Sequence, residues 1–288
     1  MMSMKAGIIG TGYMGGTHAC NLKALEVELF LYDIDQEKAK SLAQKLNANF
    51  VKDFHDFPRV DFYVIATPAW THSLYIFQLL SKDVPIFVEK PIVTSFEDFQ
   101  KIIMEAKNVD EIAVGHQLRF SPLYNYIKDL IKREKDNFEI ELWRNGRCME
   151  IKYGGALFDL GIHDIDLALW IQESPVKKME AKGTLDDTTI ILWHENGNKS
   201  TVKTRREDSF NAGLKAKSKK IEAYLDFLNN KIKINDHQIF LYSDPYFEEM
   251  KEFIEFLKGR QKTYRNSLPQ VSDSYLILFK VAEQLRSF

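Results

Sequence analysis

The sequence has few cysteines, little net charge and no long apolar run. Cys20 and Cys148 are its two cysteines among 288 residues, and their distance apart matches no metal-binding or redox motif. The formal net charge is −2, which predicts no broad basic surface for nucleic acid. No apolar stretch reaches the ~20 residues of a membrane span, and the first one is too short for a signal peptide. We therefore expect a cytoplasmic protein with reduced thiols, no metal, no nucleic-acid partner and no membrane segment.

What the sequence does have, near its start, is a glycine turn between a strand and a helix. Residues 5–9 are a short apolar strand, and residues 10–15 read G-T-G-Y-M-G. This spacing lets the chain turn tightly at Gly10, lets a diphosphate approach the backbone at Gly12, and lets the helix pack on the strand at Gly15. The following helix offers unpaired N–H groups and its positive dipole end to that phosphate. The motif is weak alone, but in this context it predicts dinucleotide binding.

An acidic residue follows at the distance that dinucleotide-binding folds use for the adenine ribose. Asp33 ends a second apolar strand, residues 27–32. A carboxylate there can accept hydrogen bonds from both ribose hydroxyls and repels a 2′-phosphate, so NAD is favoured over NADP. The plainer alternative is that Asp33 only begins a turn and that Asp35 caps the next helix.

The first ~120 residues alternate strand and helix patterns, about the length of one domain. Their later strands are apolar on both faces, which is typical of a parallel sheet covered by helices on both sides. The predicted strands are residues 5–9, 27–32, 49–51, 61–66, 85–88 and 111–114, and the predicted helices are residues 17–25, 36–46, 71–80 and 95–107. This half is therefore expected to be a Rossmann-type, doubly wound parallel sheet.

The second half changes to an α+β pattern with an open, mostly antiparallel sheet. Strands are expected at residues 138–143, 178–183, 188–193 and 199–204, with further candidates at 219–227 and 231–240. Helices are expected at residues 122–133, 156–171, 245–257 and 273–287. Asn196 and Gly197 predict a hairpin turn. The basic run 215–220 is interpreted as a solvated loop or an edge strand.

Polar residues follow the predicted parallel strands at their carboxyl ends, where open α/β sheets bind their ligands. Thr67 and Pro68 follow one strand, Glu89 and Lys90 the next, and His116 the last. A lysine at the end of a buried strand is not needed for packing, and partial desolvation would suit it to acid–base work. A plain surface lysine at a strand end is the alternative.

A second cluster lies on the predicted helix 156–171. Asp159, His163 and Asp166 fall on one face of a regular helix that is otherwise apolar. Buried polar groups are costly unless paired, so these three are expected to pair with one another or with a ligand. A metal site is possible in principle, but no further ligand is evident. A satisfied structural network is the other alternative.

These motifs together resemble the Gfo/Idh/MocA oxidoreductases, a family that includes glucose–fructose oxidoreductase and inositol dehydrogenase. The likeness extends over nearly the whole chain, and the joint occurrence of Glu-Lys-Pro with an Asp-x-x-x-His helix is its most specific part. The matching segments are residues 7–16 with His18, 66–68 with His72, 89–91, 115–122, 154–166, and 244–246 ahead of Glu249 and Phe253.

The resemblance implies a fold of two domains. Residues 1–118 would be an NAD-binding Rossmann domain, and the C-terminal helix 270–288 would pack back on it. Residues 119–269 would be a substrate and oligomerisation domain of the α+β class with a large open sheet. In the family this sheet often forms the oligomer interface, so a homo-dimer or homo-tetramer is expected.

The resemblance also implies roles for single residues. Lys90 would assist proton transfer and contact the substrate hydroxyl. Asp159 would orient the substrate or Lys90, and His163 would be a second acid–base group. Pro91 would be a cis proline that aims Lys90.

The remaining expected contacts form two sets. The residues expected to contact the cofactor are Gly10, Gly12, Tyr13, Met14, Gly15, Asp33, Thr67, Pro68, His72, Glu89, Lys90 and Pro91. The residues expected to contact the substrate are His116, Arg119, Asp159 and His163.

The implied function is an NAD-dependent oxidoreductase. It would transfer a hydride between the nicotinamide and a secondary hydroxyl or ketone of a small carbohydrate-like substrate: a sugar, a cyclitol or a nucleotide sugar. Two alternatives stay open, an NAD-dependent glycosidase-type enzyme with transient oxidation and a non-catalytic NAD(H)-binding sensor. The chain is shorter than typical members, which leaves the substrate and the oligomer open.

Overall fold

The computed structural model describes residues 3–134, 136–148 and 154–286. It divides into two compact units, each assembled from two segments of the chain. Unit 1 comprises Met1–His116 and Tyr246–Val271, and unit 2 comprises Gln117–Pro245 and Ser272–Phe288. The helix near residue 250 belongs to unit 1, and most of the C-terminal helix belongs to unit 2.

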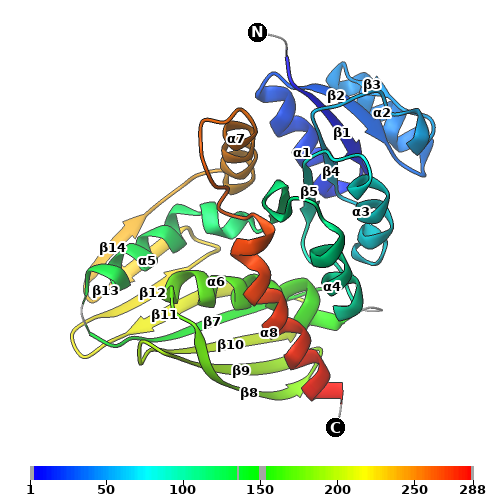
Figure 1. Cartoon of the computed structure of the whole chain (residues 1–288). Helices are drawn as coiled ribbons and strands as arrows, with labels where there is room; N and C mark the ends of the chain where they lie inside the picture. The colour runs from blue at the N-terminus through cyan, green and yellow to red at the C-terminus, as the bar shows by residue number, and fades with distance from the viewer. Residues whose placement is uncertain (1–2, 135, 149–153, 287–288) are drawn as a thin grey trace. The chain divides into compact units, whose positions relative to one another are not determined.

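Unit 1 contains a six-stranded, wholly parallel sheet in the order β3-β2-β1-β4-β5-β6 (Figure 1). Its strands are β1 (Lys5–Ile9), β2 (Glu28–Tyr32), β3 (Asn49–Phe50), β4 (Phe62–Ile65), β5 (Ile86–Glu89) and β6 (Ile112–Gly115). Its helices are α1 (Tyr13–Ala24), α2 (Gln36–Leu46), α3 (His72–Leu80), α4 (Phe96–Glu105) and nearly all of α7 (Pro245–Leu257). The predicted doubly wound sheet is confirmed.

Three neighbouring strands of this sheet are buried on both faces. Every residue of β4, β5 and β6 is buried, as expected for parallel strands covered by helices. Phe253 of α7 packs against Phe62 of β4 and Phe87 of β5, with ring centroids 5.5 and 5.7 Å apart. A helix from the far end of the sequence thus completes the core of unit 1.

The glycine turn between β1 and α1 is fixed by close backbone approaches. Gly10 has a φ of +92°, and a Cβ there would lie 2.7 Å from the carbonyl oxygen of Ala66. A Cβ on Gly15 would lie 1.9 Å from the carbonyl oxygen of Gly10, so the helix can approach the strand only without a side chain. Gly12, in contrast, faces open space.

Unit 2 contains an eight-stranded sheet in the order β14-β13-β12-β11-β7-β10-β9-β8. Its strands are β7 (Glu139–Gly146), β8 (Val176–Thr184), β9 (Asp187–His194), β10 (Lys199–Arg206), β11 (Asn211–Lys217), β12 (Glu222–Asp226), β13 (Lys231–Ile234) and β14 (His237–Phe240). The pair β7–β10 is parallel and the other pairs are antiparallel, which confirms the predicted open, mostly antiparallel sheet.

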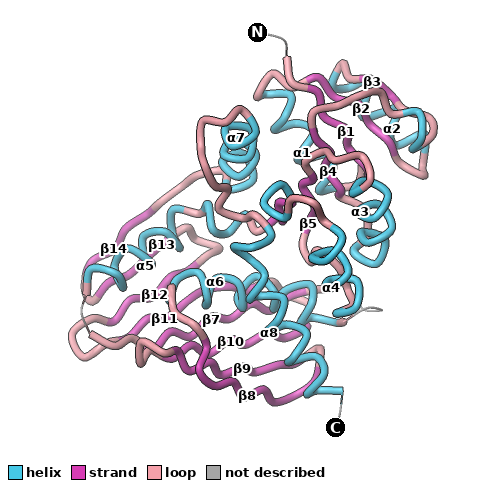
Figure 2. The backbone as a smooth tube through the Cα atoms, viewed as in Figure 1, coloured by secondary structure: helices cyan, strands magenta, loops and turns pink. Residues whose placement is uncertain are grey.

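One face of this sheet is covered by helices (Figure 2). The helices of unit 2 are α5 (Pro122–Arg133), α6 (Ile162–Gln172) and most of α8 (Leu268–Arg286). Buried and more exposed residues alternate along β7 and β9, because one face packs on the helices while the other does not. The helix predicted at 156–171 begins instead with a π-helical turn, Leu157–Gly161, and continues as α6.

The interpretation of the basic run 215–220 as a solvated loop or an edge strand was wrong for its first half only, because residues 218–220 do form a loop. Lys215 and Lys217 belong to β11, which lies inside the sheet between β12 and β7. Leu214 and Ala216 alternate with them and are fully buried. Lys215 and Lys217 point to the exposed face, so this part of the run is basic without being at an edge.

We predict opposite effects for alanine at the neighbouring positions Gly15 and Gly16. Gly15→Ala should lower the free energy of unfolding by about 1–3 kcal/mol, because its methyl group overpacks the β1–α1 turn. Gly16→Ala should raise it by about 0.5 kcal/mol, because alanine favours the helix and a Cβ on Gly16 meets nothing within 4 Å. Urea unfolding measures both, and equal stability of the two variants would contradict the close approach at Gly15.

Candidate functional site

The predicted cofactor residues of unit 1 follow strands that are neighbours in its sheet. Gly10 follows β1, Asp33 follows β2, Thr67 follows β4, and Glu89 ends β5. Because β2, β1, β4 and β5 are adjacent and parallel, these residues gather at one edge of the sheet. The fold of unit 1 therefore places these predicted cofactor residues near one another.

The N-terminus of α1 is open to an anion. Its first turn holds no acidic residue, and its N-cap residue, Gly12, has no side chain that could cap the helix. Tyr13 is 86% exposed, and Met14 is half-buried. In contrast, α2 is capped by Asp35 and α4 by Ser95. The unpaired N–H groups and the positive end of the helix dipole at α1 fit the diphosphate of a dinucleotide.

Asp33 both shapes the turn and leaves an acceptor for a ligand. Its Oδ2 accepts hydrogen bonds from the backbone N–H of Thr11 at 2.7 Å and from the Thr11 hydroxyl at 3.0 Å. Its Oδ1 accepts from the backbone N–H of Asp35 at 2.9 Å, and Asp35 caps α2. A carboxylate offers about four acceptor positions, so these three bonds leave about one for a ribose hydroxyl. The turn-forming alternative and the ribose-binding role are thus compatible.

His72, predicted as a cofactor contact, holds the backbone with both of its ring nitrogens. Its Nδ1 lies 2.9 Å from the carbonyl oxygen of Pro91, and its Nε2 lies 2.8 Å from that of Thr67. The residue is 1% exposed. It therefore ties together the chain segments that follow β4 and β5, and its structural role is to support the residues predicted to face the cofactor.

The Glu89 carboxylate is likewise hydrogen-bonded within the protein. Its Oε1 lies 2.6 Å from His18 Nε2 on α1, and its Oε2 accepts from the backbone N–H of Lys90 at 3.2 Å. Burial alone would raise the pKa of Glu89, but the hydrogen bond and charge of His18, with the charges of Lys90 and His72, hold its pKa below the ordinary value. The Lys90–Pro91 bond is cis, as the resemblance implies, and Lys90 is half-buried.

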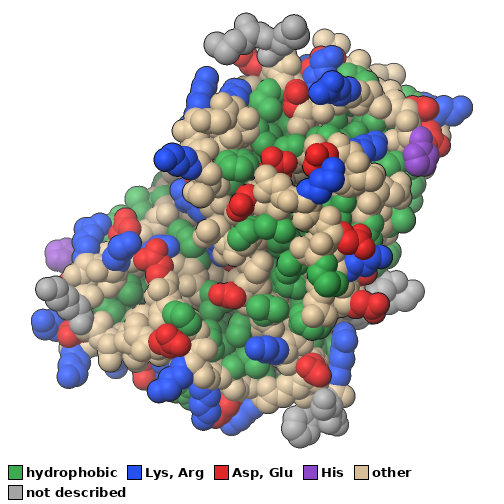
Figure 3. Space-filling model, in the orientation of Figure 1, with side chains coloured by type: hydrophobic (Ala, Val, Ile, Leu, Met, Phe, Trp, Pro, Cys, Tyr) green, Lys and Arg blue, Asp and Glu red, His purple; other side chains and the backbone are tan. Residues whose placement is uncertain are grey.

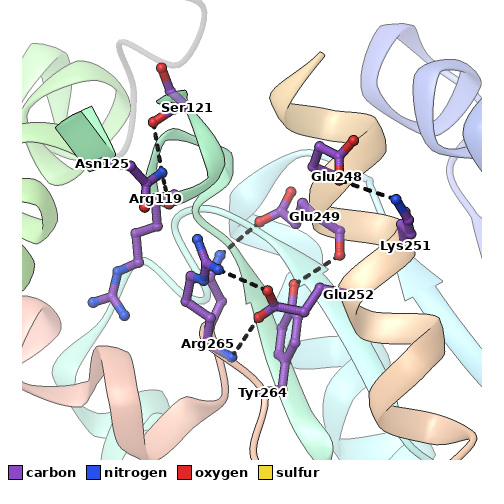
Figure 4. Close-up of polar contacts among 10 residues, drawn as sticks. Arg119, Ser121, Asn125, Glu248, Glu249, Lys251, Glu252, Tyr264 and Arg265 are labelled. Carbon is purple, nitrogen blue, oxygen red and sulfur yellow. Dashed lines mark hydrogen bonds and ion pairs between the residues drawn. The ribbon is translucent and has the colours of Figure 1, made fainter. Parts of the chain in front are cut away.

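A second buried carboxyl group, that of Glu249 on α7, was given no role from the sequence. Its Oε1 accepts from Asn266 Nδ2 at 2.8 Å, and the residue is fully buried. Burial, followed by the negative charge of Glu89, raises the pKa of Glu249 well above its ordinary value, although Asn266 and the backbone of His116 act in the other direction. One turn along the helix, Glu252 pairs with Arg265 at 3.0 Å (Figure 4).

In unit 2, the buried charges are paired with each other. The Arg119 guanidinium donates to both carboxylate oxygens of Asp166, at 2.8 and 2.7 Å, and Ser274 of α8 donates to the same carboxylate at 2.8 Å. Arg119 was predicted to contact the substrate, and Asp166 to belong to a titratable stripe. Their mutual pairing favours the structural-network alternative for these two residues.

Asp159 and His163 are not related by the regular helical spacing that their prediction assumed. Asp159 is half-buried on the π-helical turn, and His163 is 8% exposed in the first turn of α6. The next residue, Asp164, is fully buried and pairs with Arg144 at 3.0 Å. His116, also predicted to contact the substrate, is 1% exposed at the end of β6.

Three further observations concern metal ions, membranes and surface charge. Among the described residues, no group of three or more His, Cys, Asp or Glu side chains is placed to hold a metal ion. No helix in the described ranges is long and apolar enough to cross a membrane. On the face shown in Figure 3, basic and acidic side chains are interspersed and form no large patch of one sign.

Comparison with known proteins identifies both parts of the chain. Residues 4–116 match the family model described as "Oxidoreductase family, NAD-binding Rossmann fold". Residues 136–224 match the model of the GFO/IDH/MocA C-terminal domain.

Curated relatives match over most of their length. A myo-inositol 2-dehydrogenase from Thermotoga maritima is 25% identical in an alignment of 297 positions that covers 89% of each chain. A UDP-N-acetylglucosamine 3-dehydrogenase from Acidithiobacillus ferrooxidans is 26% identical over 247 residues, 81% of this chain and 77% of that one.

Solved structures share the fold. The crystal structure of the UDP-N-acetylglucosamine 3-dehydrogenase from Acidithiobacillus ferrooxidans superposes with a TM-score of 0.82 at 21% identity, covering 99% of both chains. GenD2 from gentamicin A biosynthesis, in complex with NAD, superposes with a TM-score of 0.81 at 17% identity, covering 100% of this chain and 95% of that one. Because the two models of one family together span most of the sequence, the chain belongs to the Gfo/Idh/MocA family of oxidoreductases and is an enzyme of the dehydrogenase type.

Proposed function

We propose that this enzyme is an NAD-dependent dehydrogenase acting on a secondary hydroxyl, or the corresponding ketone, of a sugar, cyclitol or nucleotide sugar. The observation that carries the proposal is the strand-end arrangement in unit 1. The glycine turn, Asp33 and Lys90 follow strands β1, β2 and β5, which lie in one parallel sheet. The dehydrogenase names of the relatives, with inositol and UDP-N-acetylglucosamine among their substrates, support the substrate class.

The residues around the turn fit a dinucleotide. The uncapped start of α1 and the open space at Gly12 would hold its diphosphate, and the remaining acceptor of Asp33 would hold a ribose hydroxyl. Tyr13, Met14 and the Thr67–Pro68 segment would complete the contacts, with His72 and Glu89 supporting them from behind. When bound, the nicotinamide supplies the hydride acceptor or donor.

Oxidation of a secondary alcohol also releases the hydroxyl proton, and this chain must take it up. We assign that proton to the Lys90 amine, with His163 as a second acid–base group and Asp159 as the residue that orients the substrate. Arg119 and His116 are assigned to the support of the site, because Arg119 is held by Asp166 and His116 is buried.

Unit 2 is proposed to carry the substrate and the oligomer contacts. Trp143 of β7 and Tyr224 of β12 lie on the face of its sheet that the helices leave uncovered, with ring centroids 5.5 Å apart, and Tyr224 is 46% exposed. Half-exposed aromatic rings are typical of protein interfaces. A homo-dimer or homo-tetramer through this sheet and a cytoplasmic location stay predictions.

The proposal is tested by following NADH absorbance with a panel of candidate substrates. The panel contains myo-inositol, UDP-N-acetylglucosamine and glucose 6-phosphate, because dehydrogenases for each are among the relatives. Net NADH formation with one of them supports a dehydrogenase. Bound cofactor with glycoside cleavage and no net NADH would identify the transient-oxidation reaction instead.

We predict that Lys90→Ala lowers kcat by about 10²–10⁴-fold, the usual contribution of a general acid–base group, while the Kd for NADH changes little. Stopped-flow or steady-state assays give kcat, and NADH fluorescence gives the Kd. Lys82→Ala, an exposed lysine of the same unit, is the matched control. Turnover close to wild type in Lys90→Ala would remove this lysine from the reaction.

We predict that Asp33→Asn raises the Kd for NAD by about 10- to 100-fold, the range expected when a charge-assisted hydrogen bond worth about 1.5–3 kcal/mol is weakened. The Kd for NADP should rise less or fall, because the negative charge that opposes a 2′-phosphate is gone. Asparagine keeps one oxygen to accept from Thr11, but its amide nitrogen cannot accept from the backbone N–H of Asp35, so thermal unfolding checks that the variant folds. Isothermal titration with both cofactors measures the ratio, and Asp56→Ala, an exposed residue, is the control. Equal losses for the two cofactors would show that Asp33 does not read the ribose.

A further inference from the structure

Unit 1 contains three buried titratable side chains, contributed by α1, β5 and α7; two of them have no role above, and the third, Glu89, has only a supporting one. We propose that His18, Glu89 and Glu249 form a buried cluster that positions Lys90. In this cluster Glu249 stays uncharged, so that the Glu89 carboxylate holds His18 with one oxygen and the backbone N–H of Lys90 with the other. The inference rests on the proposed role of Lys90, and the three residues are positioning residues that do not contact substrate.

The first step is the connection between Glu89 and Lys90. The 2.6 Å contact of Glu89 Oε1 with His18 Nε2 anchors the end of β5 to α1, and the 3.2 Å bond from the Lys90 backbone N–H to Oε2 fixes the start of the next segment. His18 is fully buried and Glu89 is 7% exposed. Because both of its oxygens are bound, the Glu89 carboxylate is held in one orientation. The same carboxylate therefore binds α1 and fixes the backbone of Lys90.

The second step is the charge of Glu249. Among the described residues, its Oε2 has no hydrogen-bond partner, while its Oε1 is held by the neutral amide of Asn266. No cation pairs with it in the described part of unit 1, and a buried carboxylate without a cationic partner is strongly disfavoured. The protonated acid is therefore the form that this environment stabilises, in agreement with its raised pKa.

The third step is the set of groups that face Glu249 from the surrounding elements. Glu89 of β5 is negative, the backbone of His116 after β6 is a hydrogen-bond partner, and Asn266 is neutral. From the same segment as Asn266, the Tyr264 hydroxyl donates to the backbone carbonyl of Glu249. On its own helix, Glu252 is negative but is paired with Arg265 (Figure 4).

It follows that loss of the Glu249 proton would place a second negative charge near Glu89. The new charge would repel the Glu89 carboxylate and disturb its bonds to His18 and to the Lys90 backbone. Glu249 thus affects Lys90 through Glu89 without touching it, and the effect appears as pH rises.

A double-mutant cycle tests the connection to Lys90, with myo-inositol as the first probe substrate and the other panel compounds after it. Glu89→Gln should lower kcat by about 10- to 100-fold, the cost expected of a small misplacement of a reacting group, with a smaller effect on the Kd for NADH. In the Lys90→Ala background the same change should lower kcat no further. Circular dichroism and thermal unfolding confirm that the variants fold.

A second measurement needs no substrate. The acetylation rate of the Lys90 amine by an N-hydroxysuccinimide ester, followed by peptide mass spectrometry, should differ between wild type and Glu89→Gln. The rate at Lys82, exposed in the same unit, should stay the same.

Glu249→Gln tests the uncharged state. Glutamine mimics the protonated acid and keeps an oxygen for Asn266, so kcat should match wild type at pH values below the folded-state pKa of Glu249. As pH rises through that pKa, the wild type should lose activity while Glu249→Gln retains it. The free energy of unfolding should change in the same direction. Because the pKa of Glu249 is raised in the folded state, the wild type should lose stability relative to the variant as pH rises. The loss should begin near 4.5, the ordinary pKa of this group, and be complete above the folded-state pKa. Glu248→Gln, an exposed neighbour on α7 paired with Lys251 at 3.7 Å (Figure 4), should behave as wild type.

The outcomes separate the inference from the proposed function. Equal kcat losses from Glu89→Gln in both backgrounds, or identical pH profiles of wild type and Glu249→Gln, would overturn the positioning cluster while Lys90→Ala still abolishes most turnover. Near-normal turnover of Lys90→Ala would instead overturn the role of Lys90 itself.

Discussion

The first unit depends on the burial of one carboxylate at the end of β5. Glu89 is nearly removed from solvent, where an unpaired charge would be strongly unfavourable. His18 and the Lys90 backbone satisfy it, and His72 ties the segment beyond it to the segment after β4. The glycine turn and the cis Lys90–Pro91 bond then lie at the same edge of the sheet. The edge proposed to bind the cofactor is therefore held by internal polar bonds that a cofactor does not need to break.

In the second unit, too, each buried charge needs a partner, but there the partners are oppositely charged side chains. This unit buries two arginines, Arg119 ahead of α5 and Arg144 on β7, and each is paired with a carboxylate of α6: Arg119 with Asp166 and Arg144 with Asp164. The Tyr124 hydroxyl accepts a further bond from Arg144, and burial raises the pKa of Tyr124 to about 12. Removing one partner of such a pair typically costs about 3–5 kcal/mol, which suits these residues to fixing the register of the helices on the sheet.

Local patterns predicted the fold well, because the strands of unit 1 are apolar on both faces and their ends carry the polar residues. They failed where local signals are weak or where the partner is distant in sequence. The helix expected from residue 17 starts at Tyr13, because Gly15 and Gly16 obscure its first turn. The small residues of β11 concealed an internal strand. The pairing of Arg119 with Asp166, and the π-helical turn beside Asp159, could not be read from periodicity, since both are set by tertiary packing.

The two-segment composition of unit 1 has a consequence for how the protein is made. Phe253 fills the space against Phe62 and Phe87, and Ser267 pairs with Ala113 of the edge strand β6. During translation, the amino-terminal sheet leaves the ribosome long before these partners exist. Its maturation must wait until nearly the whole chain has been synthesised, so the nascent sheet spends that interval with an uncovered apolar face, as a natural client for chaperones.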